Sequence, residues 1–511
     1  MRTKNILNNI AFGVGGTFIT SLLGFVSRTV FIHTLGIVYL GVNGLMISVL
    51  SMLSLAELGV GTAITFSLYK PLAENDTEKI NSLMVFYKKV YRIIGIVVFA
   101  LGLIVMCFLE YIIKDYQAIS NLQLIYFIFL VNTSYTYLFS YKRTLITADQ
   151  KAYLLVPFTT GFYLLMVAVQ IVVLIAFKNY IIYLLIQLAV KLAENIVINR
   201  YIDSKFTFLK NKISQKIPKN ELEVITKNIK AMFLHKIGDY AVNSTDNIII
   251  SAFISIKMVG LYSNYALLIA IVNKFLRIIF NSTTASFGNL IAKETKEKSF
   301  QTFKVFNFLG FWIFGWATVC FYNLLNPFIS LWIGNSYIIE QAIVNIVLVN
   351  FYLVGMRVPL SIVKMAAGVY SQDRYLPLIQ AVVNLGFSML LVQYWGLAGV
   401  FTGTVISSVT VVCWYRPLVV YKYVFATSPK RYFMKYAVYG AVVIANIFIT
   451  KYLSMFMFSS YTLGGLIGRG LICLLVPNII VVLFFFRTDE FKQLTIILKQ
   501  VLRGVIKWRK G

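Results

Sequence analysis

Long apolar stretches alternate with short polar connections along the whole chain. A helix needs roughly 20 apolar residues to cross about 30 Å of hydrocarbon. By that measure the sequence predicts an all-α polytopic membrane protein with about fourteen transmembrane helices, the second, eighth and tenth of them longer than one crossing needs. These spans lie near 10–34, 40–69, 90–112, 119–141, 153–177, 179–200, 229–253, 259–290, 303–325, 338–367, 376–394, 397–420, 433–453 and 463–486.

The composition agrees with this class of protein. Of 511 residues, 59% are hydrophobic, and the mean hydropathy is +0.79. A soluble chain of this length has too little interior to bury so much apolar surface. The four cysteines lie far apart within apolar stretches and lack metal-ligand spacing, so we expect neither a disulfide framework nor a metal site.

The positive charge is concentrated in alternate connections. A formal charge of +28 would suggest nucleic acid as a partner in a soluble protein, but in a multispan protein Lys and Arg fix the orientation. The basic connections lie at 70–92, 141–151, 200–220, 292–304, 416–435 and 486–511, whereas the others hold only Lys114, Lys178, Lys257 and Lys451. We therefore expect both termini in the cytoplasm and a basic amphipathic surface helix at 489–509. Nucleic acid is not expected as a partner.

The two halves of the chain resemble each other. The letters TKNI occur at Thr3 and Thr226, and YLGVNGL around Gly41 answers MVGLYSNYA around Gly260. An offset of about 220 residues equals six spans, so the repeat is parallel rather than inverted. The sequence thus predicts two six-helix lobes, 1–226 and 227–425, around a central cavity, and an added segment, 426–511, with two further helices.

Charged residues within the spans indicate that cavity. Each one costs at least about 2.5 kcal/mol at mid-membrane, so it normally faces a partner or water. Helical spacing aligns many of them with other polar residues in stripes on the first, second, seventh and eighth spans. The stripes are Thr17, Ser21, Gly24 and Arg28; Ser54, Glu57, Gly61 and Thr65; Lys236, Asp239, Asn243 and Asp246; and Asn273, Arg277, Asn281 and Thr284, with Lys274 at the margin.

Some of these charges have a simpler interpretation. Lys191 and Glu194, three residues apart, are expected to neutralise each other within one helix, and Lys236 with Asp239 is either a local pair or part of the site. Arg469 is expected to reach outward, and Arg357, near the kinking Pro359, fits either interpretation. In contrast, Arg28 and Arg277 have no carboxylate one turn away, so a functional role is favoured for both.

Two segments carry a family resemblance: LSLAELGVGTAITFSLYK (53–70) and STDNIIISAFISIKMVGLYSNYALLI (244–269). On fourteen spans arranged as six, six and two, they resemble the Wzx-type polysaccharide flippases of the multidrug/oligosaccharidyl-lipid/polysaccharide (MOP) exporter superfamily. The resemblance implies alternating access and transfer of undecaprenyl-diphosphate-linked oligosaccharide repeat units to the outer leaflet, for capsular, exopolysaccharide or O-antigen-type assembly. It also implies a bacterial cytoplasmic membrane, possible polysaccharide polymerase and co-polymerase partners, and cationic site residues at Arg28, Lys274 and Arg277.

The residue types fit such a substrate. Basic side chains suit a diphosphate, and amides suit sugar hydroxyls, whereas acidic groups balance the charge or couple transport to H⁺ or Na⁺. The predicted substrate-binding residues are Arg28, Arg277, Lys274, Lys236, Arg357, Asn243, Asn273 and Asn281, and the predicted charge-balancing or ion-coupling residues are Glu57, Asp246 and Asp239. No catalytic motif is present, so we expect neither an enzyme nor a resident cofactor. The alternatives are a cation-coupled multidrug exporter of the same fold, with an acidic cavity, and a non-transporting scaffold for polysaccharide synthesis.

Overall fold

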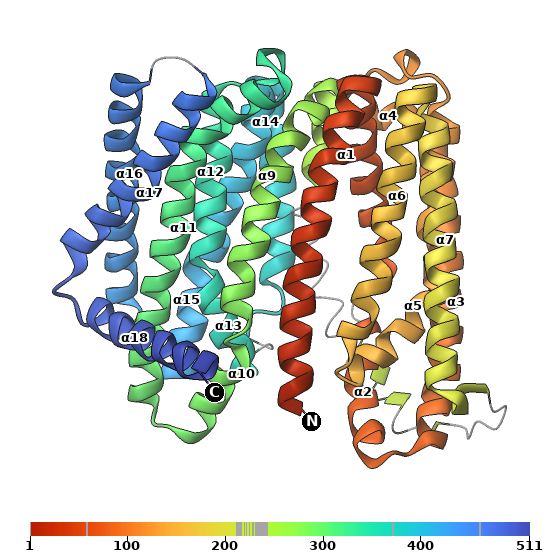
Figure 1. The fold of residues 1–511 in the computed structure, drawn as a ribbon, viewed down its shortest axis with the longest axis horizontal. Coiled ribbons are helices and arrows are strands. Elements are labelled where there is room, and N and C mark those ends of the chain that lie inside the picture. Colours follow the sequence, from red (N-terminus) through yellow and green to blue (C-terminus); the bar gives the residue numbers. More distant parts are fainter. Residues whose placement is uncertain are drawn as a thin grey trace. The chain divides into compact units, whose positions relative to one another are not determined.

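The structure, a computed structural model, is helical throughout its described part and contains no strand there. It describes residues 2–57, 60–210, 217–218, 220, 222–223, 225–226, 229, 244–369, 372–458 and 461–510. Within these residues, eleven helices are long and apolar enough to cross a membrane. The chain divides into two compact units, 1–263 and 264–511, coloured red to green and green to blue in Figure 1. The predicted lobe boundaries at 226 and 425 stay a prediction.

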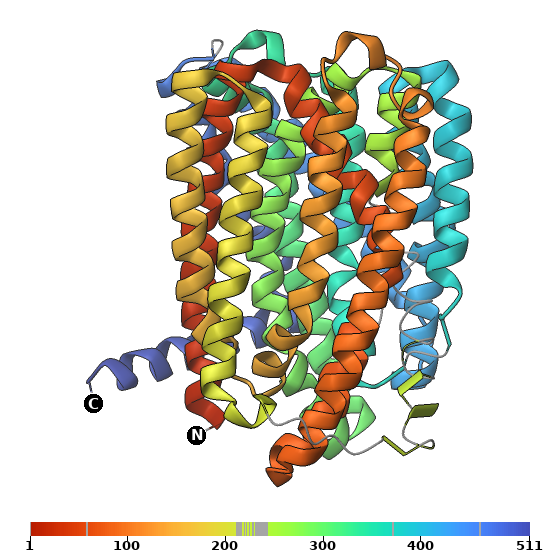
Figure 2. The same ribbon diagram turned by 90° about the vertical axis from the view of Figure 1, so that its right-hand side faces the viewer.

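Unit 1 begins with a helix that turns back on itself. α1 (Arg2–Leu53) rises from the N-terminus and bends at Gly36, whose φ of 82° favours glycine (Figure 2). The bend separates the first two predicted spans. The other helices of this unit are α2 (Val60–Glu74), α3 (Thr77–Cys107), the short α4 (Leu109–Ile112), α5 (Leu122–Ala148), α6 (Val156–Phe177), α7 (Tyr180–Lys205), residues 244–253 and the start of α9 (Ile256–Asn281).

The second predicted span is not one continuous helix. α1 ends at Leu53, the 3₁₀ turn η1 (Ser54–Glu57) follows, and α2 begins at Val60. A 3₁₀ turn has 3.0 residues per turn instead of 3.6, so helical spacing is not kept across it. The predicted stripe from Ser54 to Thr65 is therefore wrong as a single helix face, and Glu57 lies at a break.

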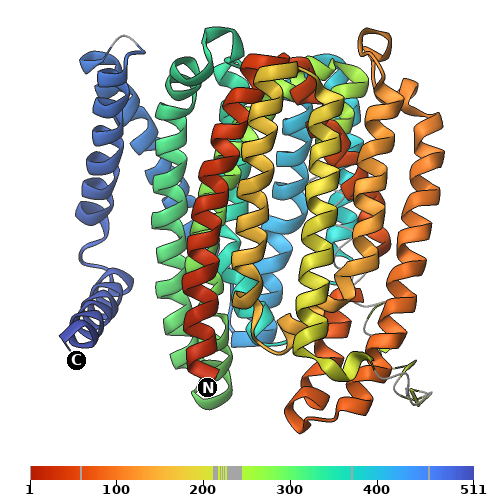
Figure 3. The same ribbon diagram turned by 45° about the vertical axis from the view of Figure 1, so that its right-hand side comes forward.

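Unit 2 contains the remaining helices. They are the rest of α9, α10 (Thr284–Lys293), α11 (Lys296–Ile333), α12 (Gln341–Met356), α13 (Val358–Ala366), α14 (Leu376–Ser407), α15 (Cys413–Val420), α16 (Lys430–Met457), α17 (Leu463–Phe485) and α18 (Asp489–Lys510), with π-helical turns η6 (Ser408–Val412) and η7 (Tyr421–Phe425). α14 includes the predicted span 376–394 and the first part of the predicted span 397–420, which meet at Gly396, where φ is 53°. The predicted amphipathic helix is confirmed as α18, which turns away from the direction of α17 (Figure 3).

The connections of unit 1 gather at two opposite ends. At the end that holds the N-terminus, Asn9 donates to the carbonyl oxygen of Gln150 (2.9 Å) and accepts from the backbone of Tyr153 (2.8 Å). At the other end, the Lys114 ammonium reaches the carbonyl oxygen of Phe253 (3.3 Å). We call the first the basic end, because the predicted basic connections at 70–92 and 141–151 return to it.

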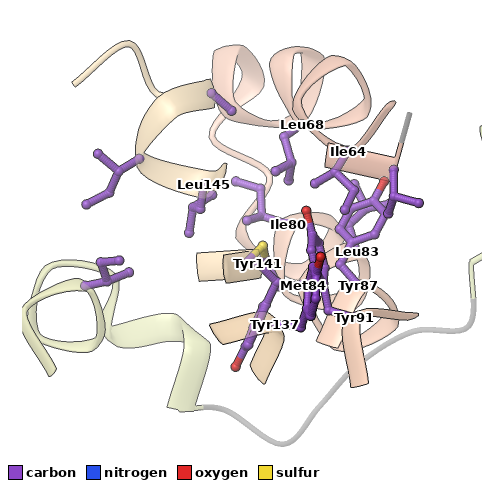
Figure 4. Packing of buried hydrophobic residues seen from close by; sticks show 14 of the residues in the cluster. Ile64, Leu68, Ile80, Leu83, Met84, Tyr87, Tyr91, Tyr137, Tyr141 and Leu145 are labelled. Carbon is purple, nitrogen blue, oxygen red and sulfur yellow. The ribbon is translucent and has the colours of Figure 1, made fainter. Parts of the chain in front are cut away.

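Each unit has its own aromatic core. In unit 1, Tyr87, Tyr91, Tyr137 and Tyr141 pack with aliphatic side chains of α2, α3 and α5 (Figure 4). In unit 2, the rings of Phe311 and Tyr439 stack at 4.1 Å. These cores hold the helices on which the charged residues lie.

Candidate functional site

α9 presents a polar face that is largely exposed in the described part of the chain. The Arg277 Nε donates to the Asn273 Oδ1 (3.3 Å), so these two predicted site residues share a face. Lys274, Arg277 and Asn281 are exposed. The segment Ile256–Lys293 is the least buried of the described spans, because 11% of its most apolar 18-residue stretch is buried, against 61% in α11. Exposed cations on a spanning helix must face water, headgroups or a ligand, because hydrocarbon would cost too much free energy.

The depth of this face follows from the helix geometry. At a rise of 1.5 Å per residue, Arg277 lies roughly 30 Å along α9 from its start at Ile256. The span starts at the end opposite the basic end, where Ile256 donates its backbone N–H to Asp115 (3.2 Å). Lys274 and Arg277 therefore lie in the half of α9 that is remote from Ile256.

Arg28 lies elsewhere, among tyrosines of unit 1. It is half-buried on α1 next to Tyr183 of α7. One turn earlier, a Cβ at Gly24 would lie 3.1 Å from the Tyr163 hydroxyl, so this face of α1 packs on α6. Arg28 lies roughly 12 Å along α1 from the turn at Gly36, near the opposite end of the unit.

Glu57 lies at the break between α1 and α2. The Tyr91 hydroxyl donates to the Glu57 Oε1 (3.2 Å), and Tyr91 is itself part of the unit 1 core (Figure 4). The carboxylate is half-buried. A carboxylate at an interrupted helix, bonded to a neutral donor, is a common arrangement for ion coupling in transporters.

The seventh predicted span is described only in part. Asp246 is half-buried next to Tyr262, and its neighbour Asn247 donates to the Ser48 Oγ of α1 (2.9 Å). The predicted site residues Lys236, Asp239 and Asn243 lie outside the described residues.

Arg357 is placed inside unit 2. It lies between α12 and α13, is 6% exposed, and donates to the Ser408 Oγ (3.5 Å). The expected interruption at Pro359 is confirmed, because α13 begins at Val358. Arg357 and the exposed α9 cations therefore have different surroundings: a packed helix interface for one, an open face for the others.

One in-membrane cluster includes a residue that the sequence analysis misses. The expected pair of Lys191 and Glu194 is confirmed (2.9 Å), but Arg143 also donates to Glu194 (3.0 Å) and to Asn195 (2.9 Å). Hydropathy places Arg143 in a connection, whereas α5 continues to Ala148. The helical spacing of the apolar residues in 141–148 is the signal from which Arg143 could have been predicted to lie within the span.

Comparison with known proteins identifies the fold. No family model matches the sequence, and no curated relative is detected. Among solved structures, the chain is similar to the lipid II flippase MurJ in an inward closed conformation, with 14% identity over 93% of this chain and 99% of that one and a TM-score of 0.64.

Two further solved structures are multidrug transporters. An inward-facing multidrug resistance MATE family transporter of the MOP superfamily shows 15% identity over 76% of this chain and 91% of that one, with a TM-score of 0.57. A mutant form of the Vibrio cholerae MATE transporter VcmN shows 14% identity over 82% and 97%, with a TM-score of 0.57. The chain therefore has the all-helical transporter fold that MATE proteins and MurJ share.

Proposed function

We propose that this protein is a MOP-type flippase that transfers undecaprenyl-diphosphate-linked oligosaccharide repeat units across a bacterial cytoplasmic membrane by alternating access. The exposed cationic face of α9, with Lys274 and Arg277, carries this proposal. A diphosphate needs several charge-assisted hydrogen bonds, and guanidinium provides a planar set of donors that keeps its charge when desolvated. The neighbouring amides of Asn273 and Asn281 are suited to sugar hydroxyls.

The orientation follows from the charge distribution. Basic connections remain on the cytoplasmic side of bacterial membranes, so the basic end of unit 1 faces the cytoplasm. Because α9 begins at the opposite end, we expect Lys274 and Arg277 near the cytoplasmic leaflet. This is where a lipid-linked substrate assembled in the cytoplasm would first be met.

Each arginine is proposed as a phosphate ligand within its own unit. Arg277 lies on the exposed face of α9, whereas Arg28 is half-buried on α1, roughly 12 Å from the bend at Gly36. A substrate that binds the inward-facing and the outward-facing state with different affinity biases the equilibrium between these states, as alternating access requires.

The acidic residues are assigned to coupling. Glu57 is bonded to a neutral tyrosine at a helix break, and a carboxylate there can exchange a proton or bind Na⁺ as the helix rearranges. Asp246, next to Tyr262, is likewise a carboxylate beside a neutral tyrosine. Polysaccharide polymerase and co-polymerase proteins would be the partners that consume the product, and no catalysis by this chain is part of the proposal.

A cation-coupled multidrug exporter is the second candidate. Its support is the fold shared with MATE transporters and the Glu57–Tyr91 bond. Cationic drugs need an acidic cavity, however, and the exposed charges on α9 are basic. The anionic substrate is therefore preferred.

A genetic test separates the two candidates. Deleting the gene in its host should make lipid-linked repeat units accumulate on the cytoplasmic face of the membrane. The intact gene should reverse this accumulation, whereas an Arg277→Ala form of equal abundance should not. A matched control is Arg374→Gln, an exposed arginine of unit 2 near Tyr375. Normal surface polysaccharide in the deletion strain, together with new sensitivity to cationic dyes, would favour the multidrug exporter.

A further inference from the structure

Two arginines of unit 2 lie together inside the helix bundle. Arg357 is 6% exposed and donates to the Ser408 Oγ (3.5 Å). Arg416 of α15 lies next to it, and its Nη1 donates to the Ser361 Oγ (3.1 Å). Ser361 in turn donates to the backbone oxygen of Arg357 (2.9 Å). The Ser361 hydroxyl thus links the Arg416 guanidinium to the backbone of Arg357.

Neither guanidinium has a carboxylate partner among the described residues. The nearby Asp373 has both oxygens bonded to the Lys364 ammonium (2.7 and 2.6 Å). The Arg416 Nε is buried and has no hydrogen-bond acceptor in the described part of the chain. Arg357 is buried and Arg416 is half-buried, and two adjacent like charges that are shielded from water without a counter-ion are costly, so this cluster calls for an anion.

The internal repeat shows what fills the equivalent position in unit 1. At an offset of 222 residues, which the match of DQKAYL (149–154) with SQDRYL (371–376) gives, Arg357 aligns with Tyr135 and Arg416 aligns with Glu194. Tyr135 lies next to Glu194, just as Arg357 lies next to Arg416. In unit 1 the Glu194 carboxylate accepts bonds from Arg143 and Lys191. Unit 2 has a second cation where unit 1 has its own anion.

An apolar crevice opens beside the arginine pair. It has a volume of about 210 Å³ and is lined by Leu353, Val409, Cys413, Trp414, Phe433 and Tyr436. Cys413 and Tyr436 are also the neighbours of the Arg357 guanidinium. Trp414 is 53% exposed, so the crevice reaches the surface of the bundle.

The depth of the pair suits a lipid headgroup. Arg416 lies roughly 14 Å from the end of η7 at Phe425, and the connection that follows is one of the basic ones. The π-helical turn η6 directly precedes α15 and begins at Ser408, the hydroxyl that faces Arg357. Such turns frequently occur at functional sites. Basic pockets between spanning helices on the cytoplasmic side are suited to anionic lipid headgroups.

We propose that Arg357 and Arg416 bind the phosphate of an anionic phospholipid of the cytoplasmic leaflet, with an acyl chain in the crevice between α12, α15 and α16. The lipid supplies to unit 2 the negative charge that Glu194 supplies to unit 1. It holds the start of α16 against α12 and α15. This assigns Arg357 to a lipid site rather than to the transported substrate, and it does not depend on the proposed flipping activity.

Native mass spectrometry of the purified full chain, titrated with phosphatidylglycerol, tests the site. The wild type should retain one phosphatidylglycerol more tightly than phosphatidylcholine. Arg357→Gln and Arg416→Gln should each weaken this binding by about tenfold or more, because a charge-assisted contact is lost. Arg374→Gln removes one exposed charge from the same unit and should bind like the wild type.

Arg416→Glu is the decisive variant, because it copies the unit 1 arrangement and gives Arg357 an internal partner. It should keep a wild-type thermal midpoint without added lipid and lose the tight phosphatidylglycerol. Inorganic phosphate should not displace the lipid at equal concentration, since it lacks the acyl chain. Unchanged lipid retention in Arg416→Glu would overturn the proposal. So would displacement of the lipid by undecaprenyl diphosphate in equal amounts, which would assign the site to the substrate.

Discussion

Gly41 of α1 and Gly260 of α9 cross backbone to backbone. A Cβ at Gly41 would lie 2.0 Å from the carbonyl oxygen of Ile256, and a Cβ at Gly260 would lie 2.3 Å from that of Ile37. Ile37 and Ile256 each precede their glycine by four residues. Each helix therefore contacts the other with the same two positions, a glycine and the isoleucine one turn before it. These glycines are also equivalent in the internal repeat. The crossing therefore joins two copies of one sequence motif near the end opposite the basic end.

Any side chain at this crossing should force the helices apart. We expect Gly41→Ala and Gly260→Ala each to lower stability by about 1–3 kcal/mol, as overpacking does, and to make a cysteine at the buried Ser48 more reactive toward maleimide. Gly15→Ala on the same helix, where a Cβ meets nothing within 4 Å, is the control. Equal maleimide reactivity of Ser48→Cys in the wild type and in all three glycine variants would show that the crossing does not hold these helices together near Ser48.

The bond between Glu57 and Tyr91 predicts a coupling defect. Glu57→Gln removes the exchangeable charge, so transport should lose its dependence on the H⁺ or Na⁺ gradient while substrate affinity stays within about twofold. Uptake measured at several imposed gradients checks this. Glu110→Gln, an exposed carboxylate in unit 1, should leave gradient dependence intact. A changed affinity with normal gradient dependence would instead make Glu57 a charge-balancing residue.

Much of the fold could be predicted because it depends on hydrophobic length and on glycine. The turns at Gly36 and Gly396 fall between predicted spans, and α18 is expected from its basic amphipathic pattern. The break at Ser54–Glu57 could not be predicted, because no proline marks it and the apolar stretch continues on both sides of it. Hydropathy reports burial in the membrane and not the continuity of backbone hydrogen bonds.

The candidate site was predicted less completely, since a pattern gives the face of a helix but not its neighbour. The spacing of Asn273 and Arg277 correctly placed both on one face. The same reasoning could not show that the face of Gly24 packs on α6, nor that Arg143 reaches Glu194. Both depend on helices far away in the sequence.

The contact of α18 with α16 predicts a pH dependence. Burial by itself raises the pKa of the Glu490 carboxyl, but the hydrogen-bonded Lys435 ammonium outweighs burial and holds that pKa below its usual range. The contact is therefore fully stabilising above the ordinary Glu pKa of about 4.3 and weakens as the pH falls through the lower folded value. Hydrogen exchange of residues 489–500 should increase at that acidic pH.

Lys435→Gln is the matched variant for this prediction. Without this cation the largest cause that lowers the Glu490 pKa is lost, so the weakening of α18 docking at acidic pH should diminish. Hydrogen exchange in 489–500 that is the same in both proteins from acid to neutral pH would rule out a contribution from the pair.

The orientation can be tested at exposed turns. Cysteines at Gln117 and Asn335 should react with an impermeant reagent added to intact cells, whereas one at Asn75, in the turn after α2, should react only after permeabilisation. The reverse pattern would place the basic connections outside and would contradict the proposed direction of transfer.

The most direct measurement is translocation by the purified protein in liposomes. A labelled undecaprenyl-diphosphate oligosaccharide should reach the opposite leaflet in the presence of the wild type, judged by its accessibility to an impermeant glycosidase. Arg277→Ala and Lys274→Ala should slow this transfer by about tenfold or more, and Arg277→Lys should restore only part of it, because lysine lacks the planar set of donors. Wild-type transfer of the lipid with this loss in both variants is the predicted result. Transfer at the rate of empty liposomes, or normal transfer by Arg277→Ala at equal protein content, would contradict it.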